Sequence, residues 1–253
     1  MPAPSPIALV TGGSRGLGRS TAEALSRRGV DSIITFNSNR TAADAVVAAV
    51  ERAGARAVAI QLDTGNTAAF PGFVAEVRRA LADWGSERID FLVNNAGTSH
   101  HAAFTEVTED DFDALYRVHL KGVFFLTQAL LPMIADGGRI VNVSSGLTRI
   151  IYPGSSAYGL MKGAVEVLTK YMAKELGDRR IAVNVVAPGA VQTDFSGGMV
   201  RDNPEINRRI SEVTALGRPG LPDDIGPMIA SLLSEDNRWV NAQRIEVSGG
   251  MMI

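Results

Sequence analysis

The feature that most constrains the fold is a regular alternation of short apolar runs with longer helix-like segments. Several of the runs are apolar at nearly every position, which indicates strands buried on both faces rather than on one. Helices connecting such strands predict an α/β fold, a doubly wound, Rossmann-type parallel sheet of about seven strands with helices on both faces. The expected strands lie at 7–10, 32–36, 57–62, 89–93, 139–143, 182–186 and 244–247.

The helix-like segments complete this pattern along the whole chain. They are expected at about 17–28, 42–53, 68–82, 108–134, 157–176 and 225–233. No linker, repeat or low-complexity stretch interrupts them, and 45% of the residues are hydrophobic, enough for one large core. We therefore expect a single domain over 1–253, with one irregular segment at about 195–218 forming a lid over a site.

Composition excludes several classes of function. The formal net charge is −2 and no basic patch stands out, so neither nucleic acid nor an anionic membrane is an expected partner. The chain has no cysteine, which excludes disulfides and thiol catalysis, and no His and carboxylate spacing suggests a metal site. No apolar stretch is long enough to span a membrane, and the segment 1–6 is too short for a leader, so the expected location is cytoplasmic.

A glycine-rich turn, Thr11–Gly18, follows the first strand and opens the first helix. Its glycines are spaced GxxxGxG rather than GxGxxG, but they also allow the backbone to approach a pyrophosphate closely. The helix N-terminus adds free N–H groups and a positive dipole end. An ordinary β–α turn is the alternative interpretation. The candidate cofactor residues here are Gly12, Ser14, Arg15, Gly16, Leu17 and Gly18.

The end of the second strand indicates which dinucleotide is bound. An NAD site usually places a carboxylate there to hold the ribose 2′-hydroxyl, whereas this chain has Asn37, Ser38 and Arg40. Without a carboxylate to repel a 2′-phosphate, and with Arg15 and Arg40 as cationic partners, the sequence favours NADP(H). Alternatively, Arg40 only marks a solvated helix start.

A tyrosine and a lysine four residues apart, Tyr158 and Lys162, begin a predicted helix and share one face of it. A free phenol has a pKa of about 10, and a nearby ammonium group and a cationic oxidised nicotinamide both favour the phenolate, so we expect them to lower the Tyr158 pKa by about 2–3 units. Ser145 follows the fifth strand, where its hydroxyl would hold a substrate oxygen beside the phenol. The chain has only four tyrosines, so chance rarely produces this pairing.

Together these motifs resemble the short-chain dehydrogenases/reductases over nearly the whole chain, with 3-oxoacyl reductases as the commonest relatives. The resemblance implies that Lys162 also holds the nicotinamide ribose and that four chains assemble through the long helix and the Tyr158 helix. It further implies cofactor contacts by position. These involve Asp63 and Thr64 at the adenine, Asn94, Ala96 and Gly97 at the floor of the site, and Pro188, Gly189, Val191 and Thr193 at the carboxamide.

The sequence departs from that family pattern at one position of the long helix. The family usually has asparagine there, holding a water that links the lysine to solvent, whereas this chain has His119. Imidazole also donates and accepts hydrogen bonds and titrates near neutrality. We hypothesise that His119 joins the proton relay; a tolerated structural substitution is the alternative.

The predicted activity is hydride transfer between NADP(H) and a ketone or secondary alcohol, a small molecule, with Tyr158 as general acid/base. Leu147 and Phe195 are expected beside Ser145 and Tyr158 in the substrate site. Further pocket candidates by position are Arg149, Ile151, Tyr152, Met199 and, more weakly, His101. The competing hypothesis is a nucleotide-binding sensor or scaffold with little catalysis, which only His119 supports.

Overall fold

The computed structural model describes residues 5–253 and contains one seven-stranded sheet in the order β3-β2-β1-β4-β5-β6-β7. Every neighbouring pair of strands is parallel. The strands are β1 (Ile7–Val10), β2 (Asp31–Phe36), β3 (Ala57–Gln61), β4 (Ile89–Asn94), β5 (Ile134–Val143), β6 (Ala182–Pro188) and β7 (Arg244–Val247). The predicted fold class is confirmed. Residues 1–4, on which the expected lack of a leader partly depends, lie outside the described range.

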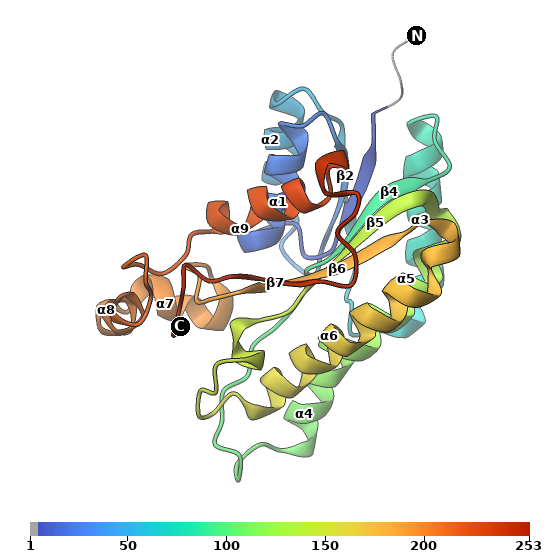
Figure 1. Cartoon of the computed structure of the whole chain (residues 1–253). Helices are drawn as coiled ribbons and strands as arrows, with labels where there is room; N and C mark the ends of the chain where they lie inside the picture. Colours follow the sequence, from blue (N-terminus) through green and yellow to red (C-terminus); the bar gives the residue numbers. More distant parts are fainter. Residues whose placement is uncertain (1–4) are drawn as a thin grey trace.

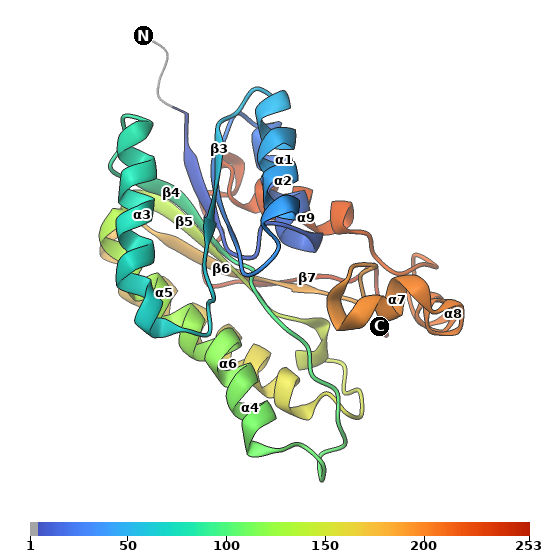
Figure 2. The same ribbon diagram turned by 180° about the vertical axis from the view of Figure 1, so that it is seen from behind.

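Helices cover both faces of this sheet, as Figures 1 and 2 show from opposite sides. One layer contains α1, α2 and α9, and the other contains α3, α5 and α6. The helices are α1 (Gly16–Ser26), α2 (Arg40–Arg52), α3 (Phe70–Asp83), α4 (Glu109–Tyr116), α5 (Gly122–Leu130), α6 (Ser156–Glu175), α7 (Met199–Asp202), α8 (Pro204–Glu212) and α9 (Pro222–Leu232).

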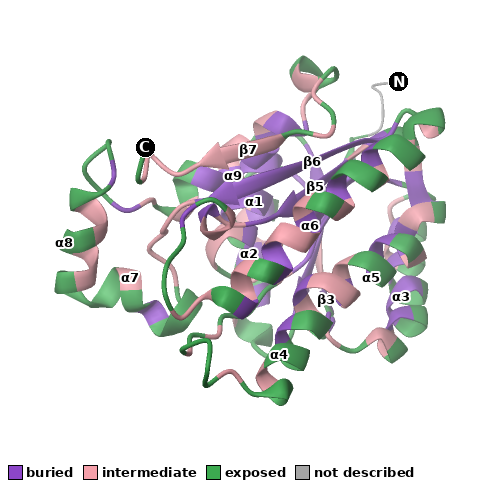
Figure 3. Ribbon diagram, turned by 60° about the horizontal axis from the view of Figure 1, so that its bottom comes forward, coloured by how far each residue is buried: buried purple, intermediate pink, exposed green. Residues whose placement is uncertain are grey.

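The strands are buried on both sides, which explains why their sequences are apolar throughout. All residues of β1, β2 and β6 are buried, and Figure 3 shows the sheet as an interior layer beneath helices with exposed outer faces. Alternate residues of one strand enter opposite cores, so that Ala8 packs toward the α1 side and Leu9 toward the α3 side. Within residues 5–253, no helix has the length and apolar character needed to cross a bilayer.

The fifth strand begins earlier than its sequence suggests. An apolar run is visible only from Arg139, but β5 starts at Ile134, which pairs with Ile89 of β4. The register shifts before the next pair, Phe91 with Arg139. Gly137 has φ +79°, so this part of the strand is bulged, and its polar and glycine residues hide it from a search for apolar runs.

The long helix expected over 108–134 is divided by a π-helical turn. After α4 ends at Tyr116, the turn Arg117–Lys121 widens the helix before α5 begins at Gly122. A Cβ atom on Gly122 would lie 2.2 Å from the carbonyl oxygen of Thr64, so only glycine allows this approach. The apolar pattern over 108–134 therefore belongs to two helices, α4 and α5, and the π-helical turn rotates the apolar face of one relative to that of the other.

The segment 195–218 contains more regular structure than its mixed composition indicates. Two short helices, α7 and α8, project to one side of the sheet and the helices that cover it (Figure 1). Ser196, Gly197 and Gly198 in succession have φ between +55° and +78°, which bends the chain sharply ahead of α7. The Asn203 side chain caps α8, in which no residue is buried.

Candidate active site

Four loops that carry predicted site residues follow the carboxyl ends of neighbouring strands. The glycine turn follows β1 and the segment 94–97 follows β4, which is the neighbour of β1 although it lies far along the chain. Ser145 follows β5, and Gly189 follows β6. The chain leaves β1 toward one edge of the sheet and returns through β4 toward the other, and ligands of such sheets bind at this reversal.

Side chains and backbone bonds lock the glycine turn to the loop after β4. The hydroxyl oxygen of Thr11 accepts hydrogen bonds from the N–H groups of Asn95 at 2.9 Å and Ala96 at 3.0 Å. In return, the Asn95 side chain donates to the carbonyl oxygens of Thr11 at 2.8 Å and Gly12 at 3.1 Å. The Gly12 N–H donates to the Thr35 hydroxyl at 3.0 Å. Thr11 and Asn95 lie within the glycine turn and the segment after β4 that were predicted to bind the cofactor, whereas Thr35 was not predicted as a site residue.

The glycine turn forms a cradle that larger residues would fill. Gly12 and Gly16 have φ of +63° and +54°, and a Cβ on Gly18 would lie 2.3 Å from the Gly12 carbonyl oxygen. Arg15, which precedes α1, gives no side-chain hydrogen bond to the first turn, so a ligand can meet those N–H groups. The cradle and the helix N-terminus fit the pyrophosphate of a dinucleotide.

The residues that directly follow β2 are exposed hydrogen-bond donors and include no carboxylate. Asn37 and Ser38 are exposed, and so are Arg15 and Arg40. Arg40 pairs with Asp44 through Nε and Oδ1 at 2.8 Å, which partly balances its charge. This edge suits a phosphate on the adenosine ribose, because two guanidinium groups flank neutral donors.

The loops after β3 and β4 place two further predicted residues differently. Asp63 is exposed, and its Oδ1 accepts a hydrogen bond from the Gly65 N–H at 2.8 Å. The Asn94 side chain instead turns inward and donates to Thr127 at 3.0 Å and to Asn142 at 2.8 Å. Asn94 therefore joins a buried polar ladder between strands, and only its backbone faces the loop.

The loop after β6 closes over the glycine turn. It leaves the sheet at Gly189, whose N–H donates to the carbonyl oxygen of Val247 at 3.0 Å. Val191 makes a single parallel bridge to the chain ahead of α9. Thr193 then lies over the turn, with its Cγ2 atom 3.6 Å from where a Cβ on Gly16 would be. The predicted carboxamide and pyrophosphate residues are thus neighbours.

Tyr158 and Lys162 lie on the first turns of α6, as predicted from their spacing. The Lys162 Nζ atom is 5.6 Å from the centre of the Tyr158 ring and donates to the carbonyl oxygen of Val143 at 2.8 Å. Ser145 accepts a hydrogen bond from the Leu147 N–H at 3.2 Å, which orients its hydroxyl. The Phe195 ring lies 6.0 Å from the Tyr158 ring, at the start of the segment 195–218.

Burial decides the protonation of this pair. Removal from water raises the pKa of Tyr158 well above its ordinary value, and a hydrogen bond with Ser145 offsets only part of this increase. Burial also lowers the pKa of Lys162 to about 8. The protein alone therefore does not lower the phenol pKa, and the expected fall, which also depends on the oxidised nicotinamide, stays a prediction. Loss of hydration of the phenolate outweighs the ammonium group, which points at the backbone of Val143.

His119 lies in the π-helical turn, fully buried behind Tyr158. Its ring meets the Tyr158 ring edge-on, with centres 5.2 Å apart, in space that a side chain on Gly97 would occupy. Nε2 lies 2.8 Å from the carbonyl oxygen and 3.3 Å from the backbone nitrogen of Thr98; because a carbonyl oxygen can only accept, we assign the ring proton to Nε2 from the shorter contact, while the buried Nδ1 has no partner within residues 5–253. Burial and the charge of Lys162 lower the pKa of His119 to about 3, so the expectation that it titrates near neutrality is wrong.

The substrate-side candidates divide into two groups. Ile151, Tyr152 and Met199 are exposed apolar side chains, and the Tyr152 ring lies 6.2 Å from that of His101. Arg149, in contrast, is tied to the C-terminal segment, because its Nε donates to Glu246 at 2.8 Å and its guanidinium also binds the carbonyl oxygens of Met251 and Met252. It lines a hollow there together with Glu246 and Val247, and its contact with a substrate stays a prediction.

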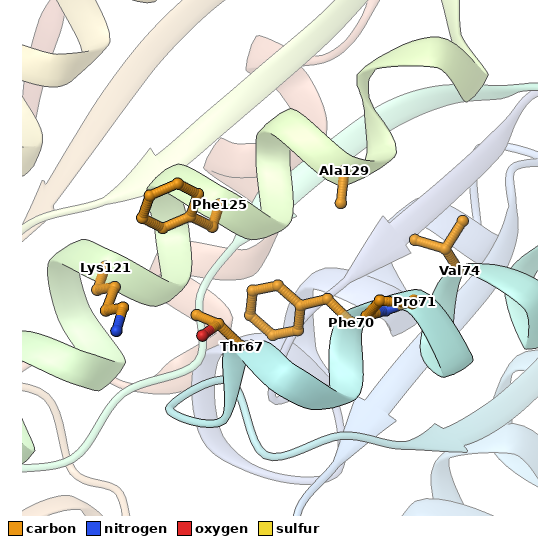
Figure 4. Close-up of a pocket in the computed structure, with 7 residues that line it drawn as sticks. All are labelled: Thr67, Phe70, Pro71, Val74, Lys121, Phe125 and Ala129. Carbon is orange, nitrogen blue, oxygen red and sulfur yellow. The ribbon is translucent and has the colours of Figure 1, made fainter.

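A separate hollow of about 420 Å³ lies between α3 and α5 (Figure 4). Figure 4 shows the rings of Phe70 and Phe125 facing each other across it, with Lys121 at one end. None of the residues that line the hollow belongs to the predicted site. They are Thr67, Phe70, Pro71, Val74, Lys121, Phe125 and Ala129.

Comparisons with known proteins identify the family. Residues 12–252 match a family model described as enoyl-(acyl carrier protein) reductase. The chain is 38% identical to an uncharacterised oxidoreductase of Methylorubrum extorquens, covering 97% of each chain, and 35% identical to a hydroxynaphthalene reductase-like protein of Metarhizium brunneum, covering 96% and 94%. It is also similar to the crystal structure of the angucycline C-6 ketoreductase LanV with bound NADP, with TM-score 0.92, 38% identity and coverage of 98% and 95%.

The chain belongs to the short-chain dehydrogenase/reductase family. The comparisons thereby confirm the predicted family and the predicted oxidoreductase class. They also bear out the prediction of carbonyl reduction with NADP(H), the chemistry of the ketoreductase relatives. The roles of individual residues stay predictions.

Proposed function

We propose that this enzyme uses NADPH to reduce a ketone on a fused-ring aromatic molecule, with Tyr158 as the proton donor. The observation that carries the proposal is the arrangement of Tyr158, Lys162 and Ser145 beside a glycine cradle that fits a dinucleotide. When bound, the reduced nicotinamide supplies a hydride to the carbonyl carbon. The remaining task of the protein is to hold the carbonyl oxygen and to give it a proton.

Tyr158 is suited to that task because it keeps its proton. Burial raises the pKa of Tyr158, so the phenol is neutral throughout the physiological range and can donate to the oxygen that becomes the alcohol. The Ser145 hydroxyl oxygen accepts a hydrogen bond from the Leu147 N–H, so its own proton can turn from the Tyr158 oxygen to the same substrate oxygen. Two donors thus converge where negative charge develops during reduction.

Lys162 stabilises the phenolate left after proton transfer. Its ammonium group lies against the Tyr158 ring and is held by the Val143 carbonyl, so it needs no rearrangement when the charge appears. With its pKa lowered to about 8, Lys162 also gives up a proton near neutrality and can return one to Tyr158. The same side chain would hold the nicotinamide ribose.

His119 contributes a lone pair rather than a titrating proton. Its Nε2–H binds Thr98, so the buried Nδ1 is the only acceptor that its ring can offer to a relay beside Tyr158 and Lys162. His119→Asn retains an acceptor, whereas His119→Phe keeps only the aromatic ring. We expect His119→Phe to change the pH dependence of kcat much more than His119→Asn; identical profiles of both variants and the parent would exclude a relay role.

The cofactor residues would share the NADP(H) molecule along the carboxyl edge of the sheet. Gly12, Gly16 and Gly18 would receive the pyrophosphate, and Arg15 and Arg40 the 2′-phosphate. Of the remaining candidates, Ser14, Leu17, Asn37 and Ser38 flank these groups, Asp63 and Thr64 would meet the adenine, and Ala96, Gly97, Pro188, Gly189, Val191 and Thr193 the nicotinamide end.

The Phe195 ring beside Tyr158 and three further exposed apolar side chains predicted on the substrate side favour a flat, apolar substrate. Phe195, Ile151, Tyr152 and Met199 are between 40% and 84% exposed and include two aromatic rings, which bind planar ring systems well. The hydroxynaphthalene reductase-like relative and the angucycline ketoreductase have names that refer to fused aromatic rings. The segment 195–218, which carries Phe195, would close over such a molecule as a lid.

A turnover assay tests this function. The protein is mixed with NADPH and with matched panels of fused-ring aromatic ketones, simple aliphatic ketones and 3-oxoacyl thioesters, and NADPH oxidation is followed by absorbance. We expect the highest kcat/KM with the fused-ring panel and a loss of about 100-fold or more in Tyr158→Phe. Preference for the thioesters would contradict the substrate class, and tight NADPH binding without turnover would favour the sensor hypothesis.

Exposed apolar residues on α5 and α6 support a homotetramer. Phe124, Leu160, Val167 and Tyr171 are 45% to 64% exposed, which is unusual for large apolar side chains unless a partner covers them. Second copies of this chain would pack here helix against helix. Phe124→Glu together with Val167→Glu should shift the mass measured by light scattering from tetramer to smaller species; an unchanged mass would contradict the interface.

The cytoplasmic location stays a prediction, which cell fractionation would test.

A further inference from the structure

The carboxylate of Glu166 holds both ends of the turn that carries Ser145. Its Oε1 atom accepts hydrogen bonds from the hydroxyl of Ser144 at 2.7 Å and from that of Thr148 at 2.8 Å. Ser144 precedes Ser145, and Thr148 ends the short helical turn that Ser145 begins. Glu166 lies two helical turns beyond Tyr158 on α6, on the same face. One carboxylate therefore ties the Ser145 turn to the Tyr158 helix.

Arg244 of β7 fixes this carboxylate from the other side. Its Nε donates to Glu166 at 2.8 Å, and its Nη2 donates to the Thr148 hydroxyl at 3.0 Å. Glu246 accepts from Arg244 at 3.0 Å and from Arg149 at 2.8 Å. Because Arg149 directly follows Thr148, both ends of this hydrogen-bond network are attached to the loop that follows Ser145.

The network is neutral overall and is partly shielded from solvent. Two arginines alternate with two glutamates, and the side chains of Glu166 and Arg244 are only 16% and 25% exposed. Burial of this kind reduces screening by salt and makes the geometry of the hydrogen bonds more rigid. None of the hydrogen bonds made by these four charged side chains involves Tyr158, Lys162 or the glycine turn.

We propose that Glu166 and Arg244 are positioning residues that set the Ser145 hydroxyl at the right distance from the Tyr158 phenol. The inference rests on the proposed function, in which both hydroxyl groups bind the carbonyl oxygen of the substrate. Without Glu166, the Ser145 turn keeps backbone bonds such as that from the Arg149 N–H to the Gly146 carbonyl at 3.0 Å. The turn would therefore stay formed but shift relative to α6.

Substitution of Glu166 should act on the chemical step and spare cofactor binding. A displacement of about 1 Å at a reacting group can lower the rate about 100-fold. We expect Glu166→Leu to lower kcat by about 10-fold to 100-fold, with the Kd for NADPH changed less than about 2-fold. Glu166→Gln keeps an oxygen acceptor for the two hydroxyl groups and weakens only the ion pair, so its kcat should fall by less than about 5-fold.

A double-mutant cycle separates positioning from a general effect on the fold. In a Ser145→Ala background, Glu166→Leu should leave kcat unchanged, because the group that Glu166 positions is gone. An equal fold-loss of kcat with and without Ser145 would overturn the proposal. Full activity of Ser145→Ala would instead overturn the proposed role of Ser145 itself. If Glu166→Leu does not fold, the same comparison is made with Glu166→Gln.

A matched control removes a carboxylate from another arginine of the same sheet. Glu235 pairs with Arg139 of β5 at 2.6 Å, before the buried run that leads to Ser145. Glu235→Gln should leave kcat and the Kd for NADPH unchanged. If Glu235→Gln lowers kcat as much as Glu166→Gln does, the effect belongs to the sheet as a whole and the positioning role is refuted.

Discussion

The imidazole of His119 meets the phenol ring of Tyr158 edge-on, with an angle of 88° between the ring planes. A π-helical turn brings the imidazole there, and the carbonyl of Thr98 fixes its proton on Nε2. Because His119 is buried and Lys162 is close, a second proton on this ring would place two positive charges together without water. The free energy of unfolding at acidic pH should therefore depend on His119.

Acidification should destabilise the protein partly through His119. The folded pKa of about 3 lies below the unfolded value of 6.5, so the unfolded chain binds an extra proton between these pH values. The free energy of unfolding should fall as pH drops from 6.5 toward 3, by up to about 1.4 kcal/mol per unit from this group alone. Urea denaturation of His119→Asn should show a shallower dependence in this window; parallel curves for variant and parent would contradict the shift.

The edge after β2 should determine cofactor preference. Asn37→Asp places a carboxylate where the ribose substituent of the cofactor is expected, and a 2′-phosphate would be repelled while a 2′-hydroxyl would be bound. We expect the ratio of kcat/KM for NADPH over NADH to fall by about 10-fold or more, an effect of about 1.4 kcal/mol. Asp44→Asn, which frees Arg40 from its ion pair, should move the ratio in the opposite direction. A ratio unaffected by both changes would remove this edge from the cofactor site.

The glycine cradle should not tolerate even one added methyl group. In Gly18→Ala the new Cβ would meet the Gly12 carbonyl oxygen at 2.3 Å, a backbone atom that cannot move without opening the turn. We expect at least about a 10-fold weaker Kd for NADPH, measured by fluorescence titration. Gly163→Ala in α6 is the matched control, since its Cβ meets nothing within 4 Å and alanine should stabilise the helix by about 0.5–1 kcal/mol. Equal NADPH affinity in both variants would refute the cradle.

The polar ladder inside the sheet should be costly to interrupt. The Asn142 side chain accepts from Asn94 at 2.8 Å and donates to Thr169 at 2.8 Å, all three residues being buried. Asn142→Leu removes one of the two hydrogen bonds made by the buried Asn94 amide and one of the two made by the buried Thr169 hydroxyl, so the free energy of unfolding should fall by about 1–3 kcal/mol in chemical denaturation. Thr41→Val, on the exposed start of α2, serves as the control. A loss below about 1 kcal/mol would show that the ladder contributes little.

The sequence predicted the fold closely where the signal was local. Parallel strands buried on both faces leave uninterrupted apolar runs, and so β1, β2 and β6 were found within two residues of their observed ends. The start of β5 was missed, because its first half is a bulge of polar and glycine residues. The helices of 195–218 were missed because α7 is only four residues long and because the short α8 has just two apolar residues on one face, Ile206 and Ile210, neither of which is buried.

The candidate site was predictable in its residues but not in its electrostatics. Fixed spacing marks Tyr158 and Lys162, and the glycine pattern marks the cradle, since both follow from helix and turn geometry. The protonation of Tyr158 and His119 depends on how much water the folded chain removes, which spacing does not reveal. Likewise Glu166 and Arg244, 78 positions apart, meet only because β7 lies beside β6 in the finished sheet.

Because of the wide turn between α4 and α5, the number of residues in this helix determines which side chain lies beside Tyr158. Each residue of an α-helix advances the side chains by about 100° around the axis. Deleting one residue between 117 and 121 would restore ordinary α-helical winding and rotate His119 away from Tyr158. The same deletion would move Gly122 out of its close contact with the carbonyl oxygen of Thr64. Insertions and deletions in this stretch should therefore be tolerated far less than substitutions on its outer surface.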